Sequence, residues 1–141
     1  MKTAKILVQK SETGLSEDNK AKLKSLKIYK DKKHFKFSNG WVDLAYELGK
    51  NIEEVCKLAN CELPKIEAMY NKYNTLRVDY HFTSPVPKIV ETLIDSLIYV
   101  TEDKSEMICE YCGKSCDIEI TEKNNNYINA CEKCFDRKNR D

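Results

Sequence analysis

The chain of 141 residues is long enough for one domain of ordinary size with a small additional module. Its charges nearly cancel, with 24 Lys and Arg against 23 Asp and Glu, which excludes a uniformly basic or acidic protein. No stretch approaches the roughly 18 consecutive apolar residues of a transmembrane helix, and no signal peptide is recognisable. The sequence therefore predicts a cytoplasmic protein without a membrane partner.

Positive charge is concentrated at the N-terminal end. Residues 1–40 carry eleven Lys and four acidic residues, whereas residues 76–106 carry three basic and six acidic residues. Only the N-terminal segment is basic enough to suggest a polyanionic partner.

The chain contains seven cysteines, an odd number, and four of them have the spacing of metal ligands. This pattern favours thiolates that hold a metal in a reducing compartment over a framework of disulfides. The isolated Cys56 and Cys61 are expected to be buried thiols.

The first forty residues predict a strand, a helix and a basic segment. Residues 4–9 form the strand, and Ser16, followed by two acidic residues, begins a helix that runs to about residue 27. Residues 28–37 are expected to form one or two strands. Their lysines, interleaved with aromatic residues, can bind phosphates beside stacked bases, or can form a solvated sheet edge whose aromatics are buried. The candidate phosphate contacts are Lys30, Lys32, Lys33 and Lys36.

Residues 41–60 predict two helices joined by a tight turn. The first helix would end at Gly49, whose missing Cβ suits a left-handed C-cap, and Asn51 would cap the second. The stretch resembles the helix-turn-helix of bacterial and phage regulators at its packing positions: Ala45, Leu48, Gly49, Val55 and Leu58.

That resemblance implies DNA contacts from the second helix, with Asn51 and Lys57 as the candidate residues. Glu53 and Glu54 share this helix and are poor neighbours for phosphates. A protein-docking or purely structural role for the unit therefore stays open.

The rest of the body is expected to contain a helix, a strand and a second helix. The first helix would run from residue 62 to Tyr73, with Pro64 in its first turn. Residues 76–82 alternate apolar and polar side chains as a half-buried strand does, and residues 85–98 carry an amphipathic helical stripe. The acid-rich residues 101–106 are expected to link a body of residues 1–100 to a module of residues 107–141.

Two C-x-x-C pairs, eighteen residues apart, predict a zinc site in this module. Each pair can direct two thiolates at one metal, and four thiolates complete the tetrahedron of a structural Zn²⁺ with no open position for catalysis. The expected ligands are Cys109, Cys112, Cys131 and Cys134. Cys116 also has ligand-like spacing from Cys112, so exchange at the site stays open.

The order of elements in residues 107–141 is a knuckle, a hairpin and a helix, which is typical of a treble clef. Here the chain resembles the zinc-binding domain of the ClpX unfoldase family, which also reads C-x-x-C-G-K-S before a hairpin and a second C-x-x-C. The resemblance implies a finger that forms homodimers and docks partner proteins. It does not extend to unfoldase activity, because no ATPase domain with a phosphate-binding glycine loop is present.

The expected fold class is therefore α+β: a mainly helical body with a helix-turn-helix-like core and a few short strands, followed by a zinc finger with four cysteine ligands. No metalloprotease, phosphate-loop or nucleophile-elbow motif occurs, which predicts a protein that is not an enzyme. Two functions fit. One is a small prokaryotic or phage transcription-associated regulator that binds nucleic acid. The other is an adaptor or inhibitor that docks on a larger host machine, such as RNA polymerase or a protease complex.

Overall fold

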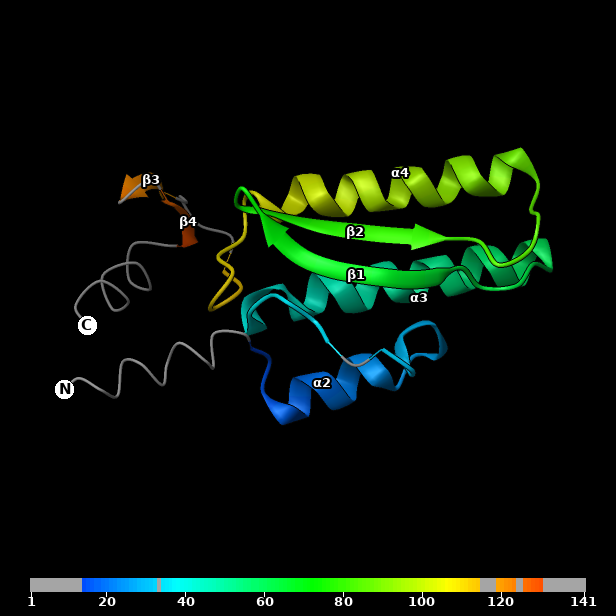
Figure 1. The fold of residues 1–141 in the computed structure, drawn as a ribbon, viewed down its shortest axis with the longest axis horizontal. Coiled ribbons are helices and arrows are strands. Elements are labelled where there is room, and N and C mark those ends of the chain that lie inside the picture. Colours follow the sequence, from blue (N-terminus) through cyan, green and yellow to red (C-terminus); the bar gives the residue numbers. More distant parts are fainter. Residues whose placement is uncertain (1–13, 33, 115–118, 124–125, 131–141) are drawn as a thin grey trace.

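The computed structural model describes residues 14–32 and 34–114, together with the backbone of strands 119–123 and 126–130 (Figure 1). This part of the chain is α+β, as predicted. Its main elements are α2 (Glu17–Lys24), α3 (Val42–Ala59), β1 (Lys65–Lys72), β2 (Thr75–His81), α4 (Lys88–Ser105), β3 (Glu119–Lys123) and β4 (Asn126–Ala130). Two 3₁₀ helices, η1 (Lys27–Tyr29) and η2 (Asn39–Trp41), connect α2 to α3. None of the described helices is long and apolar enough to cross a membrane.

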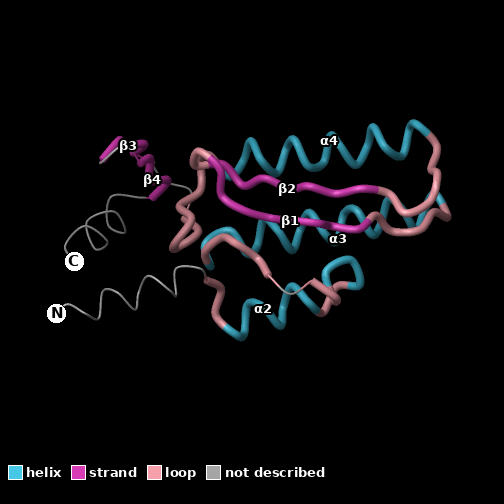
Figure 2. The backbone as a smooth tube through the Cα atoms, in the orientation of Figure 1, coloured by secondary structure: helices cyan, strands magenta, loops and turns pink. Residues whose placement is uncertain are grey.

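The centre of the body is a β-hairpin flanked by two long helices. β1 and β2 pair antiparallel around a turn at Tyr73 and Asn74, both of which have positive φ. α3 and α4 run alongside the hairpin, and α2 packs against α3 (Figure 2). One hydrophobic core joins all of these elements; its largest fully buried side chains include Trp41, Tyr29 and Phe37.

α4 covers the outer edge of β2 with polar side chains. The Ser105 hydroxyl accepts the N–H of Leu76 at 2.9 Å, and the Glu102 carboxylate accepts the N–H of Val78 at 3.3 Å. These N–H groups would otherwise lie unpaired at a sheet edge, where they cost free energy when buried and invite pairing with another strand. Side chains of α4 thereby supply the hydrogen-bond acceptors that the backbone of a third strand would otherwise provide.

α3 is one continuous helix, so the predicted break at Gly49 is wrong and residues 41–60 do not form a helix-turn-helix. Gly49 is buried, and a Cβ there would lie 2.7 Å from the Tyr29 ring. The Tyr29 hydroxyl, whose pKa is raised by burial, donates to the Ala45 carbonyl at 2.7 Å. The glycine that suggested a turn therefore makes room for an aromatic ring. Leu58, a predicted packing position, is 78% exposed.

The predicted helix of residues 62–73 is also wrong, because this stretch is strand β1. A β-bulge between Ile66 and Ala68 shifts the alternation, so Ile66 and Met69 are both buried although they are three residues apart. That spacing imitates one face of a helix. The predicted strand 76–82 is confirmed by β2.

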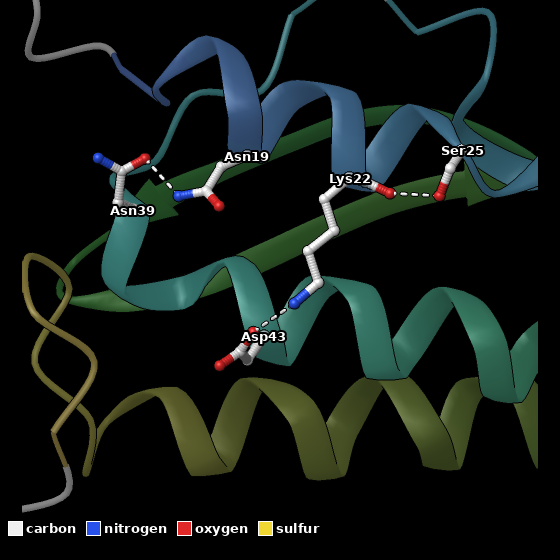
Figure 3. A network of polar contacts seen from close by, with 5 residues as sticks. All are labelled: Asn19, Lys22, Ser25, Asn39 and Asp43. Atoms are coloured by element: carbon white, nitrogen blue, oxygen red, sulfur yellow. Dashed lines mark hydrogen bonds and ion pairs between the residues drawn. The ribbon is translucent and has the colours of Figure 1, made fainter.

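α2 is attached to the body by the polar contacts that Figure 3 shows and by one buried side chain. Lys22 reaches Asp43 at 2.9 Å, and Asn19 donates to the Asn39 side chain at 2.9 Å. Ser16 caps the helix by accepting the N–H of Asn19, as predicted. The Leu23 side chain is fully buried and packs α2 against the core.

The other predictions have mixed outcomes. The amphipathic helix after Pro85 is confirmed by α4, but α4 runs to Ser105, so residues 101–105 are its last turn and not a linker. The described part of residues 28–37, which is 28–32 and 34–37, contains η1 and a bridge from Lys36 to Tyr70 but not the expected strands. β3 and β4 pair antiparallel and confirm the hairpin predicted in residues 107–141. The predicted strand of residues 4–9 and the C-terminal helix of the finger lie outside the described residues.

Candidate metal centre

Residues 109–114 form a tight turn that directs one backbone N–H at a cysteine sulfur. The N–H of Cys112 points at the Sγ of Cys109 at 3.5 Å, and the N–H of Gly113 donates to the Cys109 carbonyl at 2.9 Å. The N–H of Cys109 donates in turn to the Lys114 carbonyl at 3.1 Å, which closes the turn. Gly113 has φ +79°, a conformation that glycine adopts without strain.

This turn fits a zinc ligand pair. A sulfur that accepts a backbone N–H is better suited to carry charge, since hydrogen bonds to an ionised group are the strong ones. Two cysteines on one turn can supply two of the four thiolates of a tetrahedral site. Cys109 is buried and Cys112 is exposed.

The other two predicted ligands, Cys131 and Cys134, lie outside the described residues, as does Cys116. Among the residues that the structure describes, no three metal-ligating side chains come together. Of the four predicted ligands, the structure describes Cys109 and Cys112.

Glu110, between the two cysteines, fastens the turn to the body. Its side chain is only 6% exposed, and its carboxylate accepts the N–H of Ser38 at 3.1 Å and the side-chain amide of Asn71 at 2.7 Å. Its carbonyl accepts the N–H of Gly40 at 2.7 Å, and a Cβ on Gly40 would overlap the backbone of residues 109 and 110.

Trp41 makes a second attachment, because its indole N–H donates to the Ile108 carbonyl at 3.0 Å. The first knuckle is consequently packed into the body and is not separated from it by a linker. The sequence pattern did not single out Glu110, since its partners lie 39 and 72 residues away along the chain.

Two of the predicted phosphate contacts lie beside β1. Lys36 is bridged to Tyr70 on β1 through a hydrogen bond from its N–H to the Met69 carbonyl at 3.0 Å. Lys32 donates from its amine to the Glu67 carbonyl at 3.1 Å, and burial together with the charge of Lys36 lowers the pKa of Lys32. Lys30 is exposed in the same loop, and Lys33 lies outside the described residues.

β1 itself adds residues that the sequence analysis missed. Lys65 and Lys72 are exposed at the two ends of the strand, and Lys27, Lys32 and Lys65 border one hollow of about 230 Å³. At the hairpin tip the Lys72 amine lies 5.6 Å from the ring of Tyr73, which is 77% exposed. Only the pairing of residue 36 with β1, a tertiary contact, reveals this row of lysines.

The two predicted contacts on α3 do not act together. Asn51 and Lys57 are both exposed, but their separation of six residues places their side chains about 120° apart around the helix axis. Lys57 instead shares a face with Lys50, seven residues earlier, and both border a cleft of about 620 Å³.

Protein-family models, curated proteins and solved structures were all compared with this chain, and none of them matches it.

Proposed function

We propose that this protein is a non-enzymatic regulator that holds one structural Zn²⁺ through Cys109, Cys112, Cys131 and Cys134 and binds nucleic acid along the outer edge of β1. The observation that supports the zinc site is the N–H of Cys112 directed at the Cys109 sulfur across a glycine-closed turn. Four thiolates leave the metal no open position, and such a site stabilises a fold instead of catalysing a reaction.

The zinc would tie the C-terminal segment to the body. The knuckle is fixed to η2 and to the hairpin by Glu110, so ligands from residues 131–134 would close a loop onto a rigid base. Metal binding of this kind supplies on the order of 10–16 kcal/mol in small zinc modules, which far exceeds what their few apolar residues contribute.

Metal analysis of purified variants tests the ligand set. The wild type is expected to contain one zinc per chain, and Cys112→Ser or Cys131→Ser should lose it. Cys116→Ser is the matched control and should keep it. A Cys112→Ser protein with full zinc content, or a Cys116→Ser protein without zinc, would show that the ligands are assigned wrongly.

The row of lysines along β1 supports nucleic acid as the partner. Lys65, Lys32, Lys36 and Lys72 follow the strand, and the lowered pKa of Lys32 reflects burial and the positive charge of its neighbour Lys36. The nearest carboxylate on the strand, that of Glu67, is engaged with His81 at 2.6 Å. Lysines that track a strand, with an exposed tyrosine at its tip, suit a single-stranded backbone and a stacked base.

Binding to labelled single-stranded and duplex DNA at two salt concentrations tests this partner. The variant Lys36→Glu with Lys72→Glu should bind roughly tenfold or more weakly at ~50 mM salt and show a shallower salt dependence. Lys24→Glu with Lys88→Glu makes the same charge change away from β1 and should bind like the wild type. Lys32 is left intact because its amine supports the loop. Equal binding by both double variants would refute the assignment.

Protein docking is the second candidate, and α4 favours it. Ile89, Leu93 and Val100 are 63%, 45% and 47% exposed, and their spacing places them on one side of the helix. A partner protein with an apolar helix would cover this stripe. In that case Leu93→Asp should abolish capture of one defined partner from nuclease-treated extract, whereas the β1 lysine variant should retain it.

A further inference from the structure

The C-terminal end of α3 brings together two cysteines that are not among the expected metal ligands. Asn60 adopts the left-handed conformation, with φ 57° and ψ 46°. The N–H of Cys61 donates to the Cys56 carbonyl at 2.9 Å, and the N–H of Asn60 donates to the Lys57 carbonyl at 3.2 Å. These two bonds define a Schellman motif. In this motif the two side chains whose backbones are joined by the hydrogen bond that spans five residues commonly touch. Here those side chains are the thiols of Cys56 and Cys61.

Further observations show that the two residues lie close to each other. A direct backbone hydrogen bond keeps the two Cα atoms within about 7 Å, the limit beyond which two cysteines cannot be bridged. The pKa of the Cys56 thiol is raised, first by burial and second by the charge of Cys61, an interaction that requires proximity. Both cysteines are free.

Both cysteines line one cleft, through which a reagent can reach Cys61. The cleft has a volume of about 620 Å³, large enough for a small peptide-like molecule. Its wall carries both signs of charge, which suits a zwitterion. The charged lining residues are Lys27, Lys50, Lys57, Glu53, Glu54 and Glu62.

We propose that Cys56 and Cys61 form a redox-active dithiol that a small zwitterionic disulfide oxidises to an intramolecular disulfide. The Cys61 thiolate attacks one sulfur of the small disulfide, whose S–S bond breaks and releases one thiolate that takes up a proton. Cys56 then loses its proton and attacks the Cys61 sulfur, and the second small thiol leaves. The protein gives up two electrons and two protons, and one small disulfide becomes two thiols.

The burial of the two residues sets the order of attack. Cys61 is half-buried and meets the reagent first, whereas Cys56 is 1% exposed and resolves the mixed disulfide from the core side. The Cys61 thiol also donates to the Ala59 carbonyl at 3.5 Å, which holds it at the helix end.

Peptide mapping of the zinc-loaded, full-length protein after oxidised glutathione tests the proposal. Trypsin cuts after Lys50, Lys57 and Lys65 and so separates the two cysteines. Oxidation should yield peptides 51–57 and 58–65 joined by a disulfide, and dithiol reductant should release them. Cys61→Ser should abolish the linked pair.

Two substitutions at Asn60 test whether the turn is responsible. Asn60→Gly keeps the left-handed conformation and should leave the linked fraction unchanged. Asn60→Val disfavours it and should lower the linked fraction about tenfold at the same glutathione ratio. The wild type in urea provides a second comparison and should also link less readily than the native protein. Absence of the linked pair, stable glutathione on Cys61, or equal linking in the native and unfolded states would overturn the proposal.

Discussion

At the scale of single residues, the ionisation state of Glu102 affects the stability of the fold. Its carboxylate accepts the N–H of Val78, yet its pKa is raised because desolvation by α4 and β2 outweighs that hydrogen bond. A carboxyl group whose pKa is higher in the folded state than in the unfolded state favours folding when protonated. The ionised form therefore costs stability, and this cost is absent well below pH 4.5, the ordinary pKa of the group.

Replacing Glu102 by Gln should separate the hydrogen bond from the charge. Glu102→Gln keeps an oxygen acceptor for Val78 and removes the ionised form, so its melting temperature at pH 7 should equal or exceed that of the wild type. The advantage should shrink as the pH falls below 4.5. Glu102→Ala, the control, leaves the N–H without its acceptor and should be about 1–3 kcal/mol less stable at either pH.

Gly49 offers a second test at this scale. Alanine is the better helix former by about 1 kcal/mol, yet its Cβ would lie 2.7 Å from the Tyr29 ring and 2.9 Å from Leu26. Gly49→Ala should therefore lower the free energy of unfolding by roughly 1–3 kcal/mol, as overpacking does. In a background that already carries Tyr29→Leu, the same change should cost much less. A purely additive double-mutant cycle would contradict this packing role.

At the scale of elements, the sequence predicted those whose local pattern agrees with their packing. α2, β2 and α4 were predicted because their caps, alternation and apolar stripes are intact. β1 was missed because its bulge spaces the buried residues as a helix would. α3 was predicted as two helices because the sequence does not distinguish a glycine needed for close packing from a glycine that ends a helix. In both cases a tertiary contact decided the outcome.

The candidate site likewise has a part that could be predicted from local sequence and a part that could not. The turn of residues 109–113 could be predicted because a local spacing encodes it. Glu110 and the lysines beside β1 could not, because residues distant in sequence make their environment. Hydrogen bonds between residues far apart in the chain leave no periodicity to detect.

The attachment of α2 should depend on its buried leucine and not on the polar contacts that Figure 3 displays. Leu23→Ala should lower the free energy of unfolding by about 2–5 kcal/mol, because this side chain is fully buried. Lys22→Ala should cost less than about 1 kcal/mol, because the side chain of its partner Asp43 is 90% exposed. Chemical denaturation of both variants compares the two, and a larger loss for Lys22→Ala would contradict this view.

At the scale of the whole molecule, the proposed zinc should stabilise the body as well as the C-terminal module. Trp41, the single tryptophan, is fully buried and bonded to Ile108, next to Cys109. Chelation of zinc should therefore change its fluorescence and lower the melting temperature of the body. In Glu110→Ala the knuckle loses two side-chain hydrogen bonds, so the fluorescence response to chelation should weaken. An unchanged tryptophan signal on zinc loss would show that finger and body are independent.

The covering of β2 by α4 has a consequence for synthesis of the chain. The hairpin leaves the ribosome before Glu102 and Ser105, the residues that satisfy its outer strand. Until these two residues emerge, the outer backbone N–H groups of β2 are unpaired and can pair with other chains that are being translated from the same mRNA. The body therefore completes its fold only once the last turn of α4 has been made, and nascent chains stalled before that turn should be targets for chaperones that bind exposed strands.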